Sequence, residues 1–157
     1  MRFILFVASL LALATGAESA VAPGENQILS GKLAIVPEAK TGTAIQKAID
    51  AVAAFGGGVV RLERGVYPSG TLYLKSNVEL NIPAGATILG GAKPEDYDDV
   101  DDPRLGKTPE RSKKVFIACI DGENVAITGE GTIDGQGVGF YTSGMWADGQ
   151  FFNKPPH

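Results

Sequence analysis

From residue 59 onward, the hydrophobic residues of the chain fall in short runs that are rich in β-branched side chains and separated by Gly, Pro or Asn. Such runs are typical of β-strands. They are VVRL (59–62), TLYL (71–74), VELNI (78–82), TIL (87–89), VFIACI (115–120), VAIT (125–128) and TI (132–133). Few two-residue turns and no long helical crossover separate them, so the pattern predicts neither a hairpin meander nor a doubly wound sheet.

One earlier segment instead has hydrophobic residues at helical spacing: Ile45, Ala48, Ile49 and Val52. Thr43, followed three residues later by Gln46, predicts a capping box at the start of this helix. Three consecutive glycines at 56–58 predict its end. The alanine-rich composition predicts a helix that covers one end of an apolar structure.

A repeat accounts for the order of the predicted strands. NVELNIPAGATILGG, from Asn77, and NVAITGEGTIDGQG, from Asn124, share Asn-Val, then Gly, then Thr-Ile. The offset is 47 between the asparagines and 45 between Thr87 and Thr132, which predicts two turns of a parallel solenoid with roughly 20–25 residues per turn. Corners with positive φ are expected at Gly or Asn. The glycines interpreted as corners are Gly129, Gly131, Gly135 and Gly137.

The N-terminus predicts export. Met1-Arg2 precedes an apolar run at 3–14 and small residues at 15–17, the pattern of a secretory signal peptide. This run is shorter than the ~20 residues that span a bilayer. We therefore expect residues 1–17 to be cleaved after Ala17, with a retained anchor as the alternative. The protein is predicted to be secreted or periplasmic, without a membrane partner after cleavage, and residues 18–42 form a leader.

Composition limits the function classes. The chain has 14 basic and 18 acidic residues and a net charge of −4, so it lacks the basic surplus that nucleic-acid binding requires, and no nucleic-acid partner is predicted. Its 21 glycines and 9 prolines, with 44% hydrophobic residues, predict a turn-rich folded chain. The single cysteine, Cys119, has no intrachain disulfide partner and is expected to be a buried hydrophobic residue.

Longer motifs now carry a family resemblance. Three segments are distinctive: TAIQKAIDAVAAFGGGVVRLERGVYPSGTLYLKSNVELNIPAGATILGG, the EDY after it, and ENVAITGEGTIDGQG. Together they resemble the N-terminal part of glycoside hydrolase family 28, the polygalacturonase-type pectinases. The resemblance covers 43–157. It implies an all-β fold, the right-handed single-stranded parallel β-helix of pectin-lyase-like proteins, with the α-helix capping its N-terminal rungs. It also implies a galacturonan-like pectic polysaccharide as partner, no cofactor, and a monomer at full length.

The family's catalytic motifs N-T-D, D-D, G-H-G and R-I-K do not occur as a set, and the single histidine, His157, is the last residue. In the family, two carboxylic groups act as general acid and base on opposite sides of the glycosidic bond. The resemblance therefore implies that the catalytic residues lie beyond this chain. No catalytic residue is predicted within it, 43–157 is expected to be the truncated front of a longer domain, and this chain alone is expected to be inactive.

Two carboxylate pairs, Asp98-Asp99 and Asp101-Asp102, lie in a polar stretch that interrupts the repeat. A catalytic pair must be held rigidly and have a raised pKa on at least one member, which a solvated loop does not provide. We predict a solvated loop insertion near 91–113, with a calcium or substrate-rim role as the alternative. No metal site is predicted.

Three residues are candidates for substrate binding. Asp134 follows a predicted strand and precedes a glycine, so its side chain is expected to hydrogen-bond the turn backbone, with a groove-lining role as the alternative. Tyr141 and Trp146 belong to the aromatic stretch FYTSGMWADGQFF, whose rings could stack on the apolar faces of sugars or simply cover the solenoid.

Three functions remain open. The first is a secreted hydrolase of galacturonan-type glycosidic bonds, of which this chain is the N-terminal fragment. The second is a polysaccharide lyase or epimerase on the same solenoid, which removes a proton beside a uronic carboxylate. The third is a non-catalytic carbohydrate-binding protein. Paired aspartates with G-H-G would indicate the first, and basic residues with calcium ligands the second.

Overall fold

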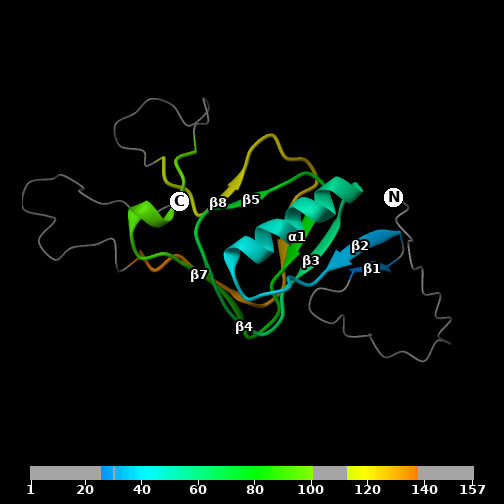
Figure 1. Ribbon diagram of the computed structural model, residues 1–157, viewed down its shortest axis with the longest axis horizontal. Helices are drawn as coiled ribbons and strands as arrows, with labels where there is room; N and C mark the ends of the chain where they lie inside the picture. The colour runs from blue at the N-terminus through cyan, green and yellow to red at the C-terminus, as the bar shows by residue number, and fades with distance from the viewer. Residues whose placement is uncertain (1–25, 30, 101–112, 138–157) are drawn as a thin grey trace, which may run out of the picture.

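The computed structural model describes residues 26–29, 31–100 and 113–137 (Figure 1). The helical elements are α1 (Gly42–Phe55) and the 3₁₀ turn η1 (Pro94–Asp96). The strands are β1 (Asn26–Leu29), β2 (Lys32–Ile35), β3 (Gly58–Arg61), β4 (Gly65–Ser69), β5 (Leu72–Leu74), β6 (Val78–Asn81), β7 (Ala86–Gly90), β8 (Ile117–Cys119), β9 (Ala126–Thr128) and β10 (Thr132–Asp134). Every predicted strand run overlaps one of these strands, so those predictions are confirmed.

Three strands were not predicted: β1, β2 and β4. β4 contains Pro68, and proline is usually excluded from central strands, so the sequence does not predict a strand there. β4 is the last strand at one side of its sheet, where the missing proline N–H removes no ladder bond. β1 and β2 lie within residues 18–42, for which the sequence predicts only a leader.

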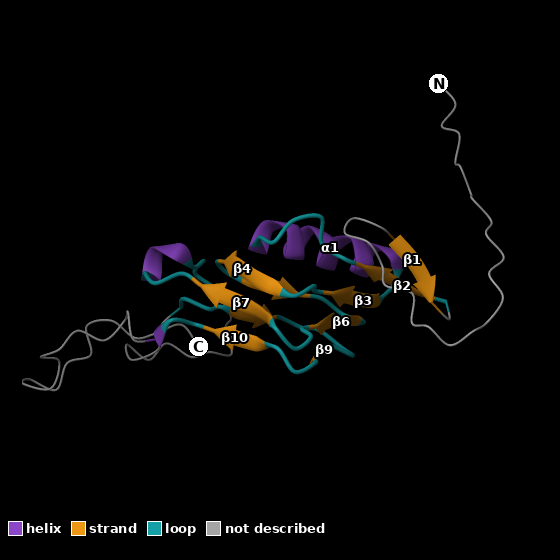
Figure 2. Ribbon diagram, turned by 90° about the horizontal axis from the view of Figure 1, so that it is seen from below, coloured by secondary structure: helices purple, strands orange, loops and turns teal. Residues whose placement is uncertain are grey.

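The strands form three sheets, and consecutive strands enter different sheets. Sheet A has the order β1-β2-β3-β6-β9, sheet B the order β10-β7-β4, and sheet C the pair β5-β8. Apart from the antiparallel β1–β2 pair, the named strands pair in parallel. From β3 onward the chain visits sheets A, B and C in turn and returns beside its own earlier strand (Figures 1 and 2). This arrangement is consistent with the predicted all-β parallel β-helix.

The two copies of the repeat stack in the predicted alignment. Thr87 pairs with Thr132, and Leu80 pairs with Ile127. The predicted separation of two turns is wrong, because β9 lies directly beside β6 and β10 directly beside β7. The preceding turn is much shorter, since Gly58 pairs with Val78. The insertion between β7 and β8 lengthens the later turn, and a repeat offset alone does not reveal it.

Asparagines occupy one row of corners, as the repeat predicts. Asn77 and Asn124 have φ of 62° and 54°, and the Asn124 amide donates to the Asn77 side-chain oxygen over 3.0 Å. Gly129, with φ of 100°, also confirms its predicted role. The other glycines predicted as corners lack positive φ, and Gln136 takes that conformation instead, with φ of 50°. The wrong assignments are Gly131, Gly135 and Gly137.

Side chains stacked from strand to strand fill the interior. Val60 of β3 pairs with Leu80 of β6, and Tyr67 of β4 pairs with Ile88 of β7. All four are almost completely buried. Since buried aliphatic side chains contribute roughly 1.5–3 kcal/mol each, these stacks are a main source of stability.

The same stacks become exposed at the last described strands. Ile127 lies beside Leu80 yet is 44% exposed, and Ile133 beside Ile88 is 40% exposed. Cys119, the register partner of Leu74, is also exposed, so its predicted burial is wrong. The run around Cys119 is hydrophobic, but no described strand pairs with the far side of β8.

The predicted helix exists, with a different start. The Thr41 hydroxyl, rather than that of Thr43, caps α1 by accepting from the Ala44 N–H over 3.2 Å. Gly56 ends the helix in the left-handed region with φ of 106°, as predicted. The Gln46 side chain does not form the predicted capping box. Its oxygen accepts from the Tyr73 N–H (2.8 Å) and its nitrogen donates to the Tyr73 carbonyl (3.1 Å).

The hydrophobic face of α1 packs against strands of all three sheets, from β2 to β6 (Figure 2). Ile45, Ile49 and Val52 are completely buried. This position agrees with the predicted covering helix. Among the described residues, no helix combines the length and hydrophobicity that crossing a membrane requires.

Candidate functional site

Asp134 ends β10 with an exposed side chain. Its register partner in β7 is Leu89, which pairs with Pro68 of β4. In each strand, the residues next to these three positions point toward the interior. The three side chains therefore form a column on the outer face of sheet B. One oxygen of the Asp134 carboxylate accepts from the Gln136 N–H over 2.8 Å. The predicted turn-stabilising hydrogen bond of Asp134 is therefore confirmed, and the carboxylate is also accessible at the surface.

Gln136 attaches this turn to the preceding strand of sheet B. Its side-chain nitrogen donates to the Gly90 carbonyl at the end of β7. Gly135 lies against the ring of Phe116, with an added Cβ 3.8 Å from the ring. The turn after β10 is thus held from two sides, so Asp134 has a defined position.

The base of the insertion packs against the same corner. Tyr97 and Phe116 are buried and meet edge to face, with ring centroids 5.5 Å apart and an interplanar angle of 77°. The Tyr97 hydroxyl donates to the Gly91 carbonyl over 2.8 Å. Burial raises the pKa of Tyr97, and the nearby Asp96 and Asp134 carboxylates raise it further. We call Gly90, Tyr97, Phe116, Asp134 and Gln136 the sheet B corner.

Asp98 and Asp99 are exposed, as the solvated insertion predicts, but both have partners. The Tyr73 hydroxyl donates to Asp98 over 3.0 Å, and the Asp98 N–H donates to the Thr71 hydroxyl over 2.8 Å. Burial raises the pKa of Tyr73, and the Asp98 carboxylate raises it further. Asp99 forms an ion pair with Lys114 over 3.3 Å.

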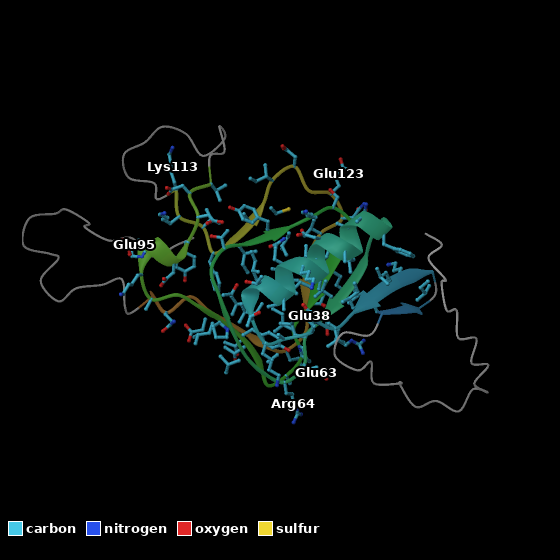
Figure 3. All side chains as sticks on the ribbon, in the orientation of Figure 1. Glu38, Glu63, Arg64, Glu95, Lys113 and Glu123 are labelled. Carbon is cyan, nitrogen blue, oxygen red and sulfur yellow. The ribbon has the colours of Figure 1, made fainter. Side chains whose placement is uncertain are left out.

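These contacts close the base of the insertion. Lys114 also donates to the Tyr97 carbonyl over 2.9 Å. Val100 is buried at 6% exposure, so the predicted loop is not solvated throughout its described part. Glu95 and Lys113, from the two sides of the insertion, lie at the same end of the molecule (Figure 3). Asp98 and Asp99 are therefore structural anchors of the insertion.

The remaining predicted residues fall elsewhere. Tyr141 and Trp146 lie outside the described residues, as do Asp101 and Asp102. Among the residues described, no cluster of three or more His, Cys, Asp and Glu side chains could hold a metal ion. The sequence did not predict Tyr97 or Gln136 as parts of the corner. The Thr-Ile-Asp-Gly-Gln-Gly run contains Gln136, but its contact with Gly90 depends on the register.

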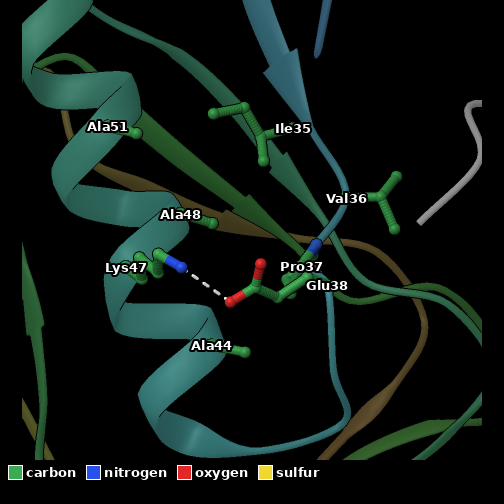
Figure 4. A pocket seen from close by; sticks show the side chains of 8 residues that line it. All are labelled: Ile35, Val36, Pro37, Glu38, Ala44, Lys47, Ala48 and Ala51. Atoms are coloured by element: carbon green, nitrogen blue, oxygen red, sulfur yellow. Dashed lines mark hydrogen bonds and ion pairs between the residues drawn. The ribbon is translucent and has the colours of Figure 1, made fainter. Parts of the chain in front are cut away.

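A hollow of about 210 Å³ lies between β2 and α1 (Figure 4). Its walls are aliphatic, and its polar groups are Lys47 and Glu38, which form an exposed ion pair over 2.7 Å. Because these two charges satisfy each other, the hollow offers little hydrogen-bonding capacity to a ligand. The sheet B corner, with its exposed carboxylate, is the better candidate site.

Known proteins resemble parts of this chain in structure and in sequence. A solved structure from Parabacteroides merdae, of a protein proposed to be a glycosyl hydrolase, matches with a TM-score of 0.51 and 29% identity. The match covers 62% of this chain and 38% of that one. The chain is therefore similar in fold to part of a protein proposed to be a glycosyl hydrolase.

Curated relatives are more specific. The exo-poly-α-D-galacturonosidase of Dickeya chrysanthemi is 37% identical over 102 residues, which is 60% of this chain and 17% of that protein. The polygalacturonases of Ralstonia solanacearum and Ralstonia nicotianae are each 35% identical, over 127 and 123 residues. Each of these two matches covers 70% of this chain and 23% of the relative.

The chain spans 17–23% of the length of these relatives. No family model matches the chain. The named relatives nevertheless support a glycoside hydrolase family 28-type N-terminal portion, as the repeat and its neighbouring motifs predict.

Proposed function

We propose that this chain is the N-terminal part of a secreted hydrolase that cleaves galacturonan-type bonds in pectic polysaccharide. The observation that carries the proposal is the 35–37% identity to proteins named as polygalacturonases or a galacturonosidase. The stacked repeat supports it, because parallel stacking gives the outer face of sheet B a regular row of side chains for an extended polymer. A right-handed parallel β-helix is the form of the fold that we propose.

In this proposal, the acid and base required for hydrolysis come from residues that lie beyond this chain in the full-length gene product. Asp134, exposed and fixed by its turn, contacts substrate at the edge of the binding surface without reacting. Trp146 and Tyr141 supply stacking contacts to the sugar rings. The N-terminal residues 1–17 act as the export signal.

The test is the release of reducing ends from polygalacturonate. The full-length gene product is expected to release them, whereas this polypeptide of 157 residues is expected to be inactive. Unsaturated products, detected by their ultraviolet absorbance, would contradict hydrolysis, because a lyase leaves a double bond and a hydrolase adds water. Activity of the short polypeptide would contradict the proposed location of the catalytic groups.

A further inference from the structure

A second hollow, of about 450 Å³, lies on sheet A at the side where its parallel strands begin. The sheet B corner lies at the end of β7 and β10 on a different sheet, as Figure 2 shows. The hollow is bordered by the end of α1, the start of β2 and the asparagine corners. Its lining includes Lys32, Phe55, Asn77, Glu79 and Asn124.

Two glycines with positive φ form part of the wall of this hollow. Gly31 and Gly56 border it, and a Cβ added to either would meet no atom within 4 Å. Both have positive φ, of 80° and 106°, so other residues are disfavoured there. The wall therefore presents backbone and a few distinct side chains to whatever occupies the space.

Phe55 is the apolar feature of the hollow, and 52% of it is exposed although it ends a helix whose other large hydrophobic residues are buried. An exposed ring beside hydrogen-bonding groups fits a ligand with one apolar face and polar edges. A sugar ring has this character, because its C–H groups gather on one face and its hydroxyls project from the edge.

The polar groups suit the rest of a uronic sugar. One oxygen of the Glu79 carboxylate accepts from the Thr128 hydroxyl over 2.7 Å. The remaining acceptor capacity of Glu79 and the carboxyl-terminal end of the α1 dipole favour hydrogen-bond donors such as hydroxyls. The Asn124 side-chain nitrogen donates to the Asn77 side-chain oxygen. This bond leaves the side-chain N–H₂ of Asn77 and the side-chain oxygen of Asn124 for a ligand. Lys32, exposed and making no ion pair with the described residues, supplies the cation that a carboxylate requires.

We propose that this hollow binds one uronate residue of the pectic chain, at a site separate from the sheet B corner. The ring packs on Phe55, its hydroxyls hydrogen-bond Glu79 and Asn124, and its carboxylate pairs with Lys32. The choice of uronate as the ligand rests on the proposed function, whereas the existence of the hollow is independent of that function. Such a site would keep the protein on its polymer while bonds are cleaved elsewhere.

Trigalacturonic acid, titrated into the ¹⁵N-labelled full chain and followed by amide chemical shifts, tests this site. Shifts are expected at 31–32, 55–58, 77–79 and 124–126. Phe55→Ala should weaken the binding that these shifts report about tenfold, because the ring contact is lost. Lys32→Gln should weaken it about threefold and reduce its salt dependence. The controls are Ile28→Ala, another exposed hydrophobic residue, and Lys93→Gln, another exposed lysine, which should change neither.

The outcomes separate this proposal from the proposed function. Binding that Phe55→Ala and Lys32→Gln leave unchanged, or no shift at these residues, overturns the hollow as a site while reducing-end release still decides the activity. Shifts at the hollow without any cleavage of polygalacturonate uphold the site and contradict the hydrolase. Equal affinity for neutral galactotriose overturns the assigned role of Lys32 and the uronate specificity.

Discussion

At the scale of single residues, the asparagine corners combine a rare backbone conformation with a side-chain bond. Asn77 and Asn124 both have positive φ, and their amides join successive turns. Asn tolerates this conformation better than most residues, and the stacked amides add a hydrogen bond that Gly cannot provide. Each asparagine therefore has two separable contributions to stability.

We expect Asn124→Ala to lower the free energy of unfolding by about 2 kcal/mol, because the alanine is strained at positive φ and the bond is lost. Asn124→Gly should recover roughly half of this loss, since it relieves only the strain. Chemical denaturation measures both. Glu123→Ala, at the neighbouring exposed position, is the control. Equal losses for Ala and Gly would show that backbone strain contributes nothing.

Tyr97 gives a prediction on pH. Its pKa is raised above the ordinary 10.0 in the folded protein, so the unfolded chain loses the phenolic proton at lower pH. The stability from neutral Tyr97 is fully present below pH 10.0 and is lost as the pH rises through the raised value. Tyr97→Phe should be less stable at neutral pH, because the bond to Gly91 is lost, but should lose less stability under alkaline conditions. Denaturation at several pH values checks this, and parallel curves for the two proteins would contradict it.

At the scale of elements, α1 protects a strand as well as filling the core. β5 pairs with β8 on one side only, and Gln46 satisfies the Tyr73 N–H and carbonyl on the other. The glutamine amide thus replaces a missing neighbouring strand at this position. An exposed strand edge is otherwise a template for pairing with another chain.

Gln46→Ala should therefore lower the free energy of unfolding by about 2 kcal/mol, because two backbone groups lose their partners. Lys47→Ala, one position away, removes only an exposed ion pair and should cost less than about 1 kcal/mol. Thermal denaturation compares them. Similar effects for the two variants would show that water replaces the amide at no cost.

Strand positions could be predicted from sequence because β-branched residues and turn residues report local geometry. The stacked partners of the repeat followed from the same signal. The number of turns between the two copies of the repeat could not be predicted, because the insertion adds residues to one turn without a periodic pattern of its own. Similarly, Asp134 was predicted from its turn, whereas Gln136 and Tyr97 join the corner through contacts between distant segments that a single sequence does not encode locally.

At the scale of the whole molecule, the stacks of hydrophobic side chains are covered by α1 at one end and exposed at the last described strands (Figure 2). Equivalent positions in successive turns therefore differ in what they contribute. Leu80 is completely buried, and its partner Ile127 is 44% exposed.

Leu80→Ala should destabilise the chain of 157 residues by about 3 kcal/mol, the usual cost of a cavity in a core. Ile127→Ala should cost roughly half as much, because part of its side chain already contacts water. Urea denaturation of the same chain measures both. A larger loss at Ile127 would show that other residues cover it.

The reactivity of Cys119 reports whether the exposed face at the last described strands is open or covered. This cysteine is the single thiol of the chain and sits on top of Leu74, at the face where the next layer would stack. Alkylating reagents should reach this sulfur freely when the face is open and slowly when polypeptide seals it. The labelling rate of one atom thus distinguishes an open stack from a sealed one.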